Sequence, residues 1–424
     1  MRFLLGASAS NATVQNIALA LHDMGILAGY YTTGADNFGT SPFGRLRREV
    51  GAALPGVDRR LSRRRITSVP EELIHPDWTW DLPRTAASML GADARVTDWF
   101  WDRSEKGLDA RCARAMEGLN FDAFFGIEYG ALATARVCQQ LGKPVVLGLL
   151  SPHHSLREQW VDPEYERFPE LLTPAARRLM ELAHRRDRRR DEETQAADVI
   201  FINSSLSRRS LEQAGFAEKR FITVLNGAPS ALADTMLPTR LAQPLRFIYA
   251  GSVAVHKGVQ YLLEAWRQLR PTTSAELHLY GTLHLPKRIF QNCGDNVFFH
   301  GRVSGDRLSA AYREAAALVF PTLYDGFGLV VTEALAQGLP VLTTSNAGAA
   351  EVLDEGSTGF VVPAANAEAL AERMEWCLTH PRQLVQMRPH ALAAARALTW
   401  ARYRSELRQQ LTAALTPPAL EKGA

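Results

Sequence analysis

Cysteine is scarce in this chain of 424 residues. The four cysteines, Cys112, Cys138, Cys293 and Cys377, lie far apart, and none belongs to a C-x-x-C pair or to a Cys/His pair at zinc spacing. This pattern argues against reactive or metal-binding cysteines, which are the alternative. The sequence therefore predicts four buried thiols.

Long apolar runs are also missing, since no window approaches the ~20 uninterrupted apolar residues that a membrane-spanning helix needs. The chain begins with "MRFLLGASAS", in which one arginine precedes an apolar run, as in a signal peptide. However, the apolar run at residues 3–5 is much shorter than the ~7–15 residues of a secretory core. We therefore predict a first β-strand here and a protein that stays in the cytoplasm.

Neither sign of charge dominates, because the formal net charge is only +3. This argues against a dedicated nucleic-acid binder. The exception is the segment 45–65, where eight arginines face two acidic residues and alternate with apolar ones. Such a basic amphipathic surface fits peripheral contact with anionic lipid on the inner face of the membrane, or contact with a phosphorylated acceptor. An ordinary solvated face is the alternative, because arginine is common along the whole chain.

The length predicts two domains, since single hydrophobic cores stop growing near ~250–300 residues. In both halves short β runs alternate with helical segments, which predicts α/β domains with parallel sheets and crossover helices. We place the first Rossmann-like domain at 1–228, a Pro/Ala-rich linker at 229–244 and the second Rossmann-like domain at 245–398. A last helix at 399–416 is in a position to pack back on the first domain. Ligands bind beyond the carboxyl ends of parallel strands, so the cleft between the domains is the expected site.

The segment 321–341, "PTLYDGFGLVVTEALAQGLPV", follows a buried strand, and its helix begins near Leu329. Gly326 and Gly328 allow backbone N–H groups to approach a ligand, and a helix start carries about half a positive charge, so a diphosphate fits here. Asp325 and Glu333 would accept hydrogen bonds from hydroxyl groups. The sequence therefore predicts a ligand with both phosphate and sugar hydroxyls.

A second loop supports this prediction. A strand ends at Gly251-Ser252, and Lys257 and Gly258 follow before the next helix. Lys257 would supply the fixed positive charge that a departing diphosphate requires. For this segment alone, the alternative is a turn glycine beside a solvated lysine.

Taken in order, the segments "GSVAVHKG", "HLYG", "VFFHGRV", "YDGFGLVVTEALAQGLPV", "NAGAAEVL" and "GSTGFVVP" resemble the nucleotide-sugar-binding half of the family 4 glycosyltransferases. The resemblance is dense from Ala197 to Leu378 and thins before it. It implies the GT-B fold, in which two Rossmann-like domains face a central cleft, and transfer with retention of anomeric configuration.

The resemblance assigns roles in the donor site. It implies that Asp325, with Gly326-Phe327-Gly328 beside it, contacts hydroxyls of the donor sugar, that Glu333 holds the ribose, and that Lys257 binds the diphosphate. It also implies that the loop Gly301-Arg302-Val303 packs on the base. Two positions depart from the family pattern, since family members usually have Glu where Asp325 stands and Arg where Ser252 stands.

In the first half, the family usually has a glycine-rich turn near the donor phosphate, where this chain has "ASASN" at 7–11. Ser10 or Asn11 would cap the next helix, and either would be able to donate to phosphate. The resemblance also implies that a histidine at the end of "PVVLGLLSPHHS" contacts the transferred sugar, without separating His153 from His154. Glu128 is an acceptor-side candidate of lower rank.

Four tryptophans, at 78, 80, 99 and 101, cluster within 24 residues. Aromatic faces stack on sugars or anchor at membrane interfaces, although tryptophans more often fill cores. Trp78 and Trp80 are the acceptor-side candidates of this group.

The sequence has no D-x-D motif, so we expect neither a metal nor a cofactor beyond a nucleotide-sugar co-substrate. The resulting prediction is a hexosyltransferase that acts on a glycan or lipid-linked acceptor. The arginine-rich composition favours a bacterial surface polysaccharide pathway by association. A non-catalytic scaffold subunit with this fold is one alternative, favoured by Ser252 and the missing glycines. A sugar-nucleotide epimerase is the other.

Overall fold

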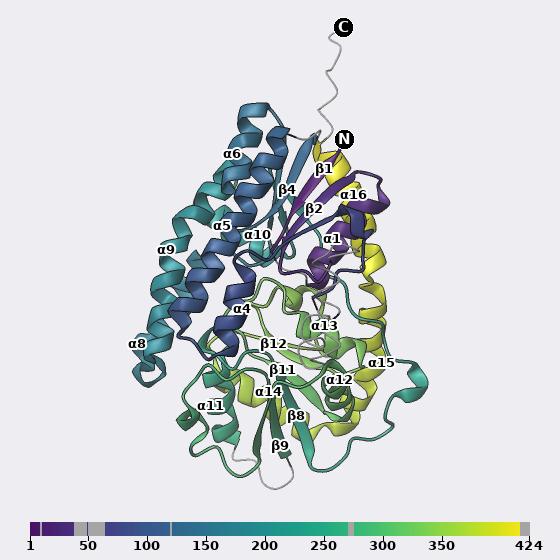
Figure 1. Ribbon diagram of the computed structural model, residues 1–424. Coiled ribbons are helices and arrows are strands. Elements are labelled where there is room, and N and C mark those ends of the chain that lie inside the picture. The colour runs from purple at the N-terminus through teal and green to yellow at the C-terminus, as the bar shows by residue number, and fades with distance from the viewer. Residues whose placement is uncertain (9–10, 38–48, 50–63, 119–120, 270–274, 416–424) are drawn as a thin grey trace.

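The computed structural model describes residues 1–8, 11–37, 49, 64–118, 121–269 and 275–415. These residues form two α/β domains, one above the other in Figure 1, and each domain is built on one parallel sheet. The predicted doubly wound architecture is therefore confirmed. Apart from Glu49, Arg64 and Arg65, the basic segment 45–65 lies outside the described residues, so its predicted membrane contact stays a prediction.

The first sheet has seven strands in the order β3-β2-β1-β4-β5-β6-β7. Its central strands are buried on both faces, as expected for parallel strands covered by helices. The strands are β1 (Phe3–Gly6), β2 (Leu27–Thr33), β3 (Ile74–Asp77), β4 (Ala123–Ile127), β5 (Val145–Leu149), β6 (Val199–Ile202) and β7 (Arg220–Thr223).

Helices cover both faces of this sheet and enclose one apolar cluster on each. One face is covered by α1 and the other by α5 and α6, and α9 lies beside α6 (Figure 1). The helices are α1 (Ala12–Asp23), α4 (Asp81–Met89), α5 (Ala94–Gly118), α6 (Leu132–Leu141), α7 (Ser155–Trp160), α8 (Asp162–Arg167), α9 (Pro174–Ala196) and α10 (Ser205–Leu211).

The second sheet has six strands in the order β10-β9-β8-β11-β12-β13. The strands are β8 (Leu245–Ala250), β9 (Ala275–Tyr280), β10 (Val297–Gly301), β11 (Ala317–Phe320), β12 (Val341–Thr344) and β13 (Gly359–Val362). The helices of this half are α11 (Val259–Leu269), α12 (Gly305–Glu314), α13 (Leu329–Ala336), α14 (Ala367–Thr379), α15 (Pro381–Ala397) and α16 (Trp400–Leu415). All four cysteines of the chain are buried and unpaired, as predicted.

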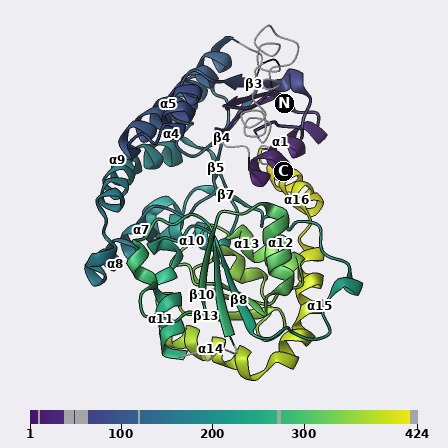
Figure 2. The same ribbon diagram turned by 60° about the horizontal axis from the view of Figure 1, so that its bottom comes forward.

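The chain crosses between the domains twice, and the two crossings lie side by side because Ala228 pairs with Thr399. After the second crossing, α16 runs back along α1 in both Figure 1 and Figure 2 and adds Tyr403 and Leu407 to the core of the first domain. The first half of the chain likewise contributes to the second domain, since Val161 and Leu171 join its core. Val161 and Leu171 therefore belong to the predicted first domain, 1–228, by their place in the sequence, but they pack with the second domain.

The carboxyl ends of the two sheets face each other. The loop after β11 contacts the loop after β5 so closely that a Cβ on Gly326 would lie 2.4 Å from the carbonyl oxygen of Leu150. Similarly, a Cβ on Gly348 would lie 2.7 Å from the Cβ atom of Ser204, which follows β6. The predicted site between the domains is thus bounded by strand ends from both.

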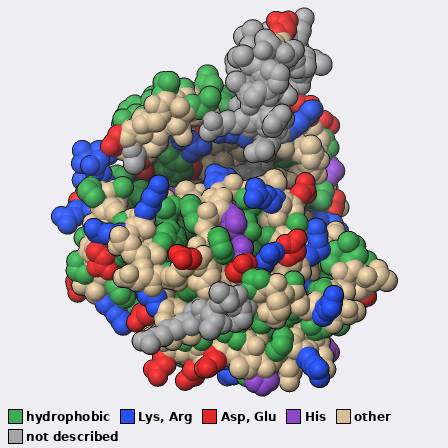
Figure 3. Space-filling model, turned by 90° about the horizontal axis from the view of Figure 1, so that it is seen from below, with side chains coloured by type: hydrophobic (Ala, Val, Ile, Leu, Met, Phe, Trp, Pro, Cys, Tyr) green, Lys and Arg blue, Asp and Glu red, His purple; other side chains and the backbone are tan. Residues whose placement is uncertain are grey.

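No helix in the described part of the chain is long and apolar enough to cross a membrane. Figure 3 views the molecule from the side of the second domain. On the described part of that face, acidic and basic side chains are interspersed.

Candidate active site

Three neighbouring strands of the second domain end at the same edge and bring two predicted donor loops together. The N–H of Gly251 donates to the carbonyl of Tyr280 over 2.9 Å, and the N–H of Gly281 donates to the carbonyl of Gly301 over 2.9 Å. Ser252 therefore lies at the same edge as the loop that begins at Gly301. Arg302 in that loop is exposed, and Val303 is half-buried.

The loop after β8 ends in a short 3-10 turn, Val255–Lys257, capped by Gly258 at φ 67°. A Cβ on Gly258 would lie 1.8 Å from the carbonyl oxygen of Pro321, the first residue after β11. The missing side chain therefore allows this loop to press against the β11 loop. This contact holds Lys257 next to the residues that follow Pro321.

We expect Gly258→Ala to destabilise the second domain by at least about 2 kcal/mol, because a left-handed backbone and an overpacked contact each contribute roughly 1–3 kcal/mol. The free energy of unfolding in urea measures this. Gly301→Ala is the matched control, since Gly301 has the same φ of 67° and no atom within 4 Å of its would-be Cβ. Equal losses in the two variants would contradict the close contact with Pro321.

Lys257 and Asp325 form an ion pair at the centre of this arrangement. Lys257 Nζ lies 2.6 Å from Asp325 Oδ2, and both side chains are about one-fifth exposed. The other carboxylate oxygen, Oδ1, accepts a hydrogen bond of 3.1 Å from the N–H of Phe327. Lys257 and Asp325, which were predicted to contact separate parts of the ligand, are therefore in direct contact.

The helix that follows begins where the sequence placed it, at Leu329, with Gly328 as its N-cap at φ 88°. The N–H of Val331 donates to the carbonyl of this cap over 2.9 Å. The N–H groups of Leu329 and Val330 precede that hydrogen bond, so the start of the helix is a position that favours an anion. The ring of Phe320 connects this start to the lysine. Lys257 Nζ lies 5.8 Å from its centroid, and a Cβ on Gly328 would lie 2.9 Å from its edge. Phe327 itself is buried.

Glu333 lies one turn into α13, and its Oε2 accepts a hydrogen bond of 3.3 Å from the hydroxyl group of Tyr312 on α12. Burial raises the pKa of the Glu333 carboxyl, and the hydrogen bond from Tyr312 lowers it in part. Tyr312 was not among the residues predicted from the sequence. No local pattern singles it out, because it comes from a different helix.

On the side of the first domain, Asn11 caps α1. Its Oδ1 accepts a hydrogen bond of 3.0 Å from the N–H of Val14, which confirms its capping role. Ser10 lies outside the described residues. The predicted donation from Asn11 to a phosphate remains a prediction.

His153 and His154 follow β5 and meet the same carboxylate. The Nε2 atoms of the two rings lie 3.0 Å and 2.9 Å from Oδ1 of Asp191 on α9. Burial lowers the pKa of His153, while its contact with Asp191 acts in the opposite direction. The ligand atoms of the three residues lie within 4.8 Å of one another, close enough to hold a metal ion. No sequence pattern indicates Asp191, which comes 37 residues after His154.

Glu128 at the end of β4 is also close to α9, with its Oε1 3.6 Å from Nε of Arg190. Burial raises the pKa of the Glu128 carboxyl, and the charge of Arg190 opposes this. A cavity of about 340 Å³ lies between the domains, lined by Arg157 and Leu179 from the first and by Ser252 and Tyr324 from the second. Ser252 thus faces a space that both domains enclose.

The tryptophans contact other side chains of the first domain, three of them half-buried and Trp99 47% exposed. Trp78 donates its indole N–H to the carbonyl of Ala35 over 2.9 Å, and Arg64 lies over its ring. Trp80 meets Trp99 edge to face, with ring centroids 5.6 Å apart. These contacts describe structural roles, and the predicted acceptor contacts of Trp78 and Trp80 remain untested.

Glu105 on α5 is a buried carboxyl that no sequence pattern indicates. Its side chain is near Ser8, in the loop after β1, and near Arg84. Burial raises its pKa to about 7, while the hydrogen bond with Ser8 and the charge of Arg84 act in the opposite direction. Between pH 4.5 and about 7 the Glu105 carboxyl is therefore protonated in the folded state and ionised in the unfolded state.

This makes Glu105 a source of pH-dependent stability. Between pH 4.5 and about 7 the folded state binds more protons at this group, so stability falls as the pH rises through this window. Glu105→Gln, which stays neutral, should match the wild type at pH 5 and exceed its free energy of unfolding by up to about 3 kcal/mol at pH 8. Urea denaturation at both pH values tests this.

Glu117→Gln, at an exposed position of the same helix, controls for the loss of one negative charge. A difference between Glu105→Gln and the wild type that is the same at pH 5 and pH 8 would show that the buried carboxyl does not retain its proton.

The match to a known protein family covers the second domain. Residues 244–380 match the family described as glycosyl transferases group 1. The capsular polysaccharide biosynthesis glycosyltransferase CapM of Staphylococcus aureus is 30% identical over 199 residues, which cover 42% of this chain and 52% of CapM. The first two curated relatives are matched over only 33% and 52% of their own length.

Two solved structures match nearly the whole chain. The Anabaena protein HepE in complex with UDP and glucose has a TM-score of 0.60 at 16% identity, covering 97% of this chain and all of HepE. The lipopolysaccharide outer core galactosyltransferase WaaB has a TM-score of 0.60 at 13% identity, covering 98% and 100% of the two chains. Membership of family 4 in particular stays a prediction. The chain has the two-domain GT-B fold of these glycosyltransferases, and its second domain matches the glycosyl transferases group 1 family.

Proposed function

We propose that this protein is a retaining glycosyltransferase that moves a hexose from a nucleotide-diphosphate sugar to a glycan or lipid-linked acceptor. The observation that carries this proposal is the ion pair of Lys257 and Asp325 beside the start of α13, with Glu333 one turn along the same helix. A cation and a helix N-terminus suit a diphosphate. Carboxylates beside them suit the hydroxyls of the sugar and the ribose.

The same residues account for the chemistry. In glycoside hydrolysis a protein acid must protonate a poor leaving group, whereas a nucleoside diphosphate departs without one. Departure instead requires stabilisation of the charge that develops on the β-phosphate. The ammonium group of Lys257 has three N–H donors, so it can contact a phosphate oxygen and Asp325 together. Same-face attack, in which the departing phosphate oxygen takes the proton of the acceptor hydroxyl, gives retention of configuration.

The relatives favour a particular donor and acceptor class. CapM is named for capsular polysaccharide biosynthesis, and HepE was solved with UDP and glucose. By this similarity we propose a uridine nucleotide as donor and a bacterial surface glycan as acceptor. The cytoplasmic location stays a prediction, as does independence of metals and cofactors. An unchanged rate after treatment with EDTA would support metal independence.

Thermal unfolding with UDP, GDP and ADP tests the proposal, followed by an assay for free nucleoside diphosphate released from the matching sugar nucleotide. We expect one nucleotide to raise the melting temperature and to appear as product when acceptor is present. Stabilisation without net release of nucleotide would favour the epimerase. No response to any nucleotide at millimolar concentration would favour the scaffold subunit.

A further inference from the structure

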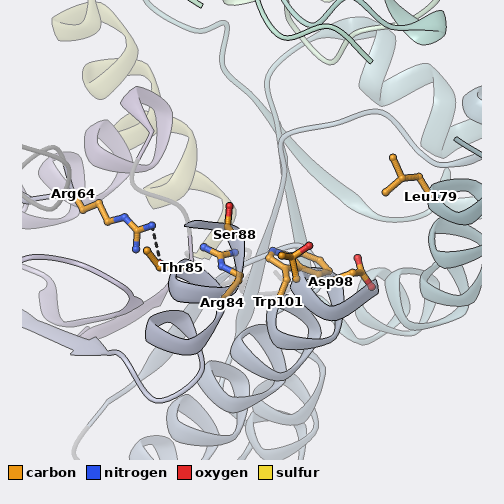
Figure 4. A pocket seen from close by; sticks show the side chains of 8 residues that line it. Arg64, Arg84, Thr85, Ser88, Asp98, Trp101 and Leu179 are labelled. Atoms are coloured by element: carbon orange, nitrogen blue, oxygen red, sulfur yellow. Dashed lines mark hydrogen bonds between the residues drawn. The ribbon is translucent and has the colours of Figure 1, made fainter. Parts of the chain in front are cut away.

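A second cavity lies within the first domain, between α4, α5 and α9, and has a volume of about 370 Å³. This falls in the ~300–1,000 Å³ range of small-molecule sites. Figure 4 shows its lining side chains. Arg84 and Thr85 come from α4, Trp101 from α5 and Leu179 from α9, and Arg64 reaches in from the segment before β3.

The two arginines are held in place by one buried acid. Arg64 Nη1 lies 2.5 Å from Oδ2 of Asp81, and Arg84 Nη2 lies 2.5 Å from Oδ1 of the same carboxylate. The side chain of Asp81 is only 2% exposed, whereas those of Arg64 and Arg84 are 30% and 31% exposed. Asp81 therefore fixes both guanidinium groups while part of each still lines the cavity. Arg64 is fixed further by donating from Nη2 to the hydroxyl of Thr85 over 3.2 Å.

The charges at this site do not cancel. Two guanidinium groups share the single carboxylate of Asp81. Asp98, which also lines the cavity, is engaged by Arg186 of α9. Glu105 is near Arg84, but burial raises its pKa to about 7, so its negative charge is only partly present at neutral pH. Among these described side chains, positive charge is in excess.

The position of the cavity connects it to the proposed reaction. Leu179 lines both this cavity and the cavity between the domains, which Ser252 of the donor side also lines. The two cavities are therefore adjacent, and a molecule bound in this one would lie beside the space between the domains. Trp101 and Leu179 provide apolar walls, and the arginines provide an end rich in N–H donors. This combination suits a sugar that carries an anionic group.

We propose that this cavity binds an anionic group of the acceptor, a phosphate or a carboxylate, through Arg64 and Arg84. The guanidinium group matches both anions because each presents two oxygens to its planar fork of N–H donors. The inference rests on the proposed function, since it names the chemical class of the acceptor of that reaction. It would make the first domain selective for acidic glycans or sugar phosphates over neutral sugars.

Calorimetric titration of the full chain with glucose 6-phosphate, glucuronate and glucose tests the proposal. The nucleotide that stabilises the protein is present at a saturating concentration, so that the phosphate group of glucose 6-phosphate cannot bind in the nucleotide site. We expect at least one of the two anionic sugars to bind at least tenfold more tightly than glucose. Binding of glucose 6-phosphate alone identifies a phosphate-bearing acceptor, and binding of glucuronate alone identifies an acidic sugar. Equal binding of all three would overturn the proposal.

Variants locate the site. Arg84→Ala should weaken binding of the anionic sugar by about tenfold or more, since a hydrogen bond to a charged group contributes about 1.5–3 kcal/mol. Arg84→Lys should have a smaller effect, because it keeps the positive charge but loses the planar pair of N–H donors. This variant replaces Arg84→Ala in the test if the alanine variant does not fold. Arg114→Ala removes the same charge from an exposed position on α5 and should have little effect. Unchanged anion binding in both Arg84 variants would exclude this cavity.

The outcome separates this inference from the proposed function. If no nucleotide stabilises the protein, the glycosyltransferase proposal fails, and the sugars are then titrated without nucleotide. If nucleotide binding is intact in Arg84→Ala and the wild type does not prefer anionic sugars, only the anionic acceptor is wrong.

Discussion

Replacing Lys257 with alanine is expected to lower turnover by about 10²–10³, the usual effect of removing one preorganised donor to a developing negative charge. Lys257 Nζ is held 2.6 Å from Asp325 and beside the ring of Phe320, which is in contact with the start of α13. The lysine therefore needs little reorganisation to stabilise a departing diphosphate. Initial rates of nucleoside diphosphate release, at saturating donor, measure the effect.

Two comparisons separate chemistry from stability. Lys106→Ala removes an exposed lysine that pairs with Asp102 one helical turn away, and such pairs contribute only ~0.3–0.5 kcal/mol. This variant should keep its rate. Lys257→Ala also removes the ionic partner of Asp325, so its melting temperature is recorded with the rate. A loss of turnover below threefold in a folded Lys257→Ala variant would exclude the assigned role.

The second large effect concerns nucleotide binding. A ligand at a hundred times its dissociation constant adds ~2.7 kcal/mol to folding stability, and Glu333→Ala is expected to lose most of this response. The carboxylate is placed on the first turns of α13, where it is assigned to the ribose. The shift in melting temperature with the stabilising nucleotide, measured for wild type and variant, gives the result.

Tyr312→Phe is the matched control for Glu333. It removes the 3.3 Å hydrogen bond to Oε2 but leaves the carboxylate in place. This variant should keep most of the nucleotide response. A full response in Glu333→Ala, or an equal loss in both variants, would contradict direct contact between Glu333 and the nucleotide.

The donor half of the site was largely predictable from the sequence. Asp325, the two glycines and the beginning of α13 lie within a few residues of one another, directly after a strand, so strand and helix periodicity places them. The family resemblance assigned Lys257 to the same diphosphate, but its position beside these residues depends on the pairing of β8 with β11, which only the structure shows. What the sequence did not show is that Lys257 and Asp325 touch.

The first domain was much less predictable. Asp191 meets the two histidines, and Arg186 holds Asp98, only because the 23-residue helix α9 runs alongside the other helices of that domain. Both contacts join residues far apart in the chain. In the sequence, the arginines of α9 indicate only a charged helix face, and nothing near them indicates the acidic residues with which they pair.

The sequence by itself determined the alternation of strands and helices, the two parallel sheets and the loop chemistry that suits a diphosphate and sugar hydroxyls. These features depend on residues close together in the chain, where periodicity and backbone preference act. Only the tertiary structure decided that α16 completes the core of the first domain, that Glu333 meets Tyr312, and that Arg64 and Arg84 share Asp81. Such contacts depend on the packing of distant segments, and their free energy comes from burial and charge pairing that no local pattern records.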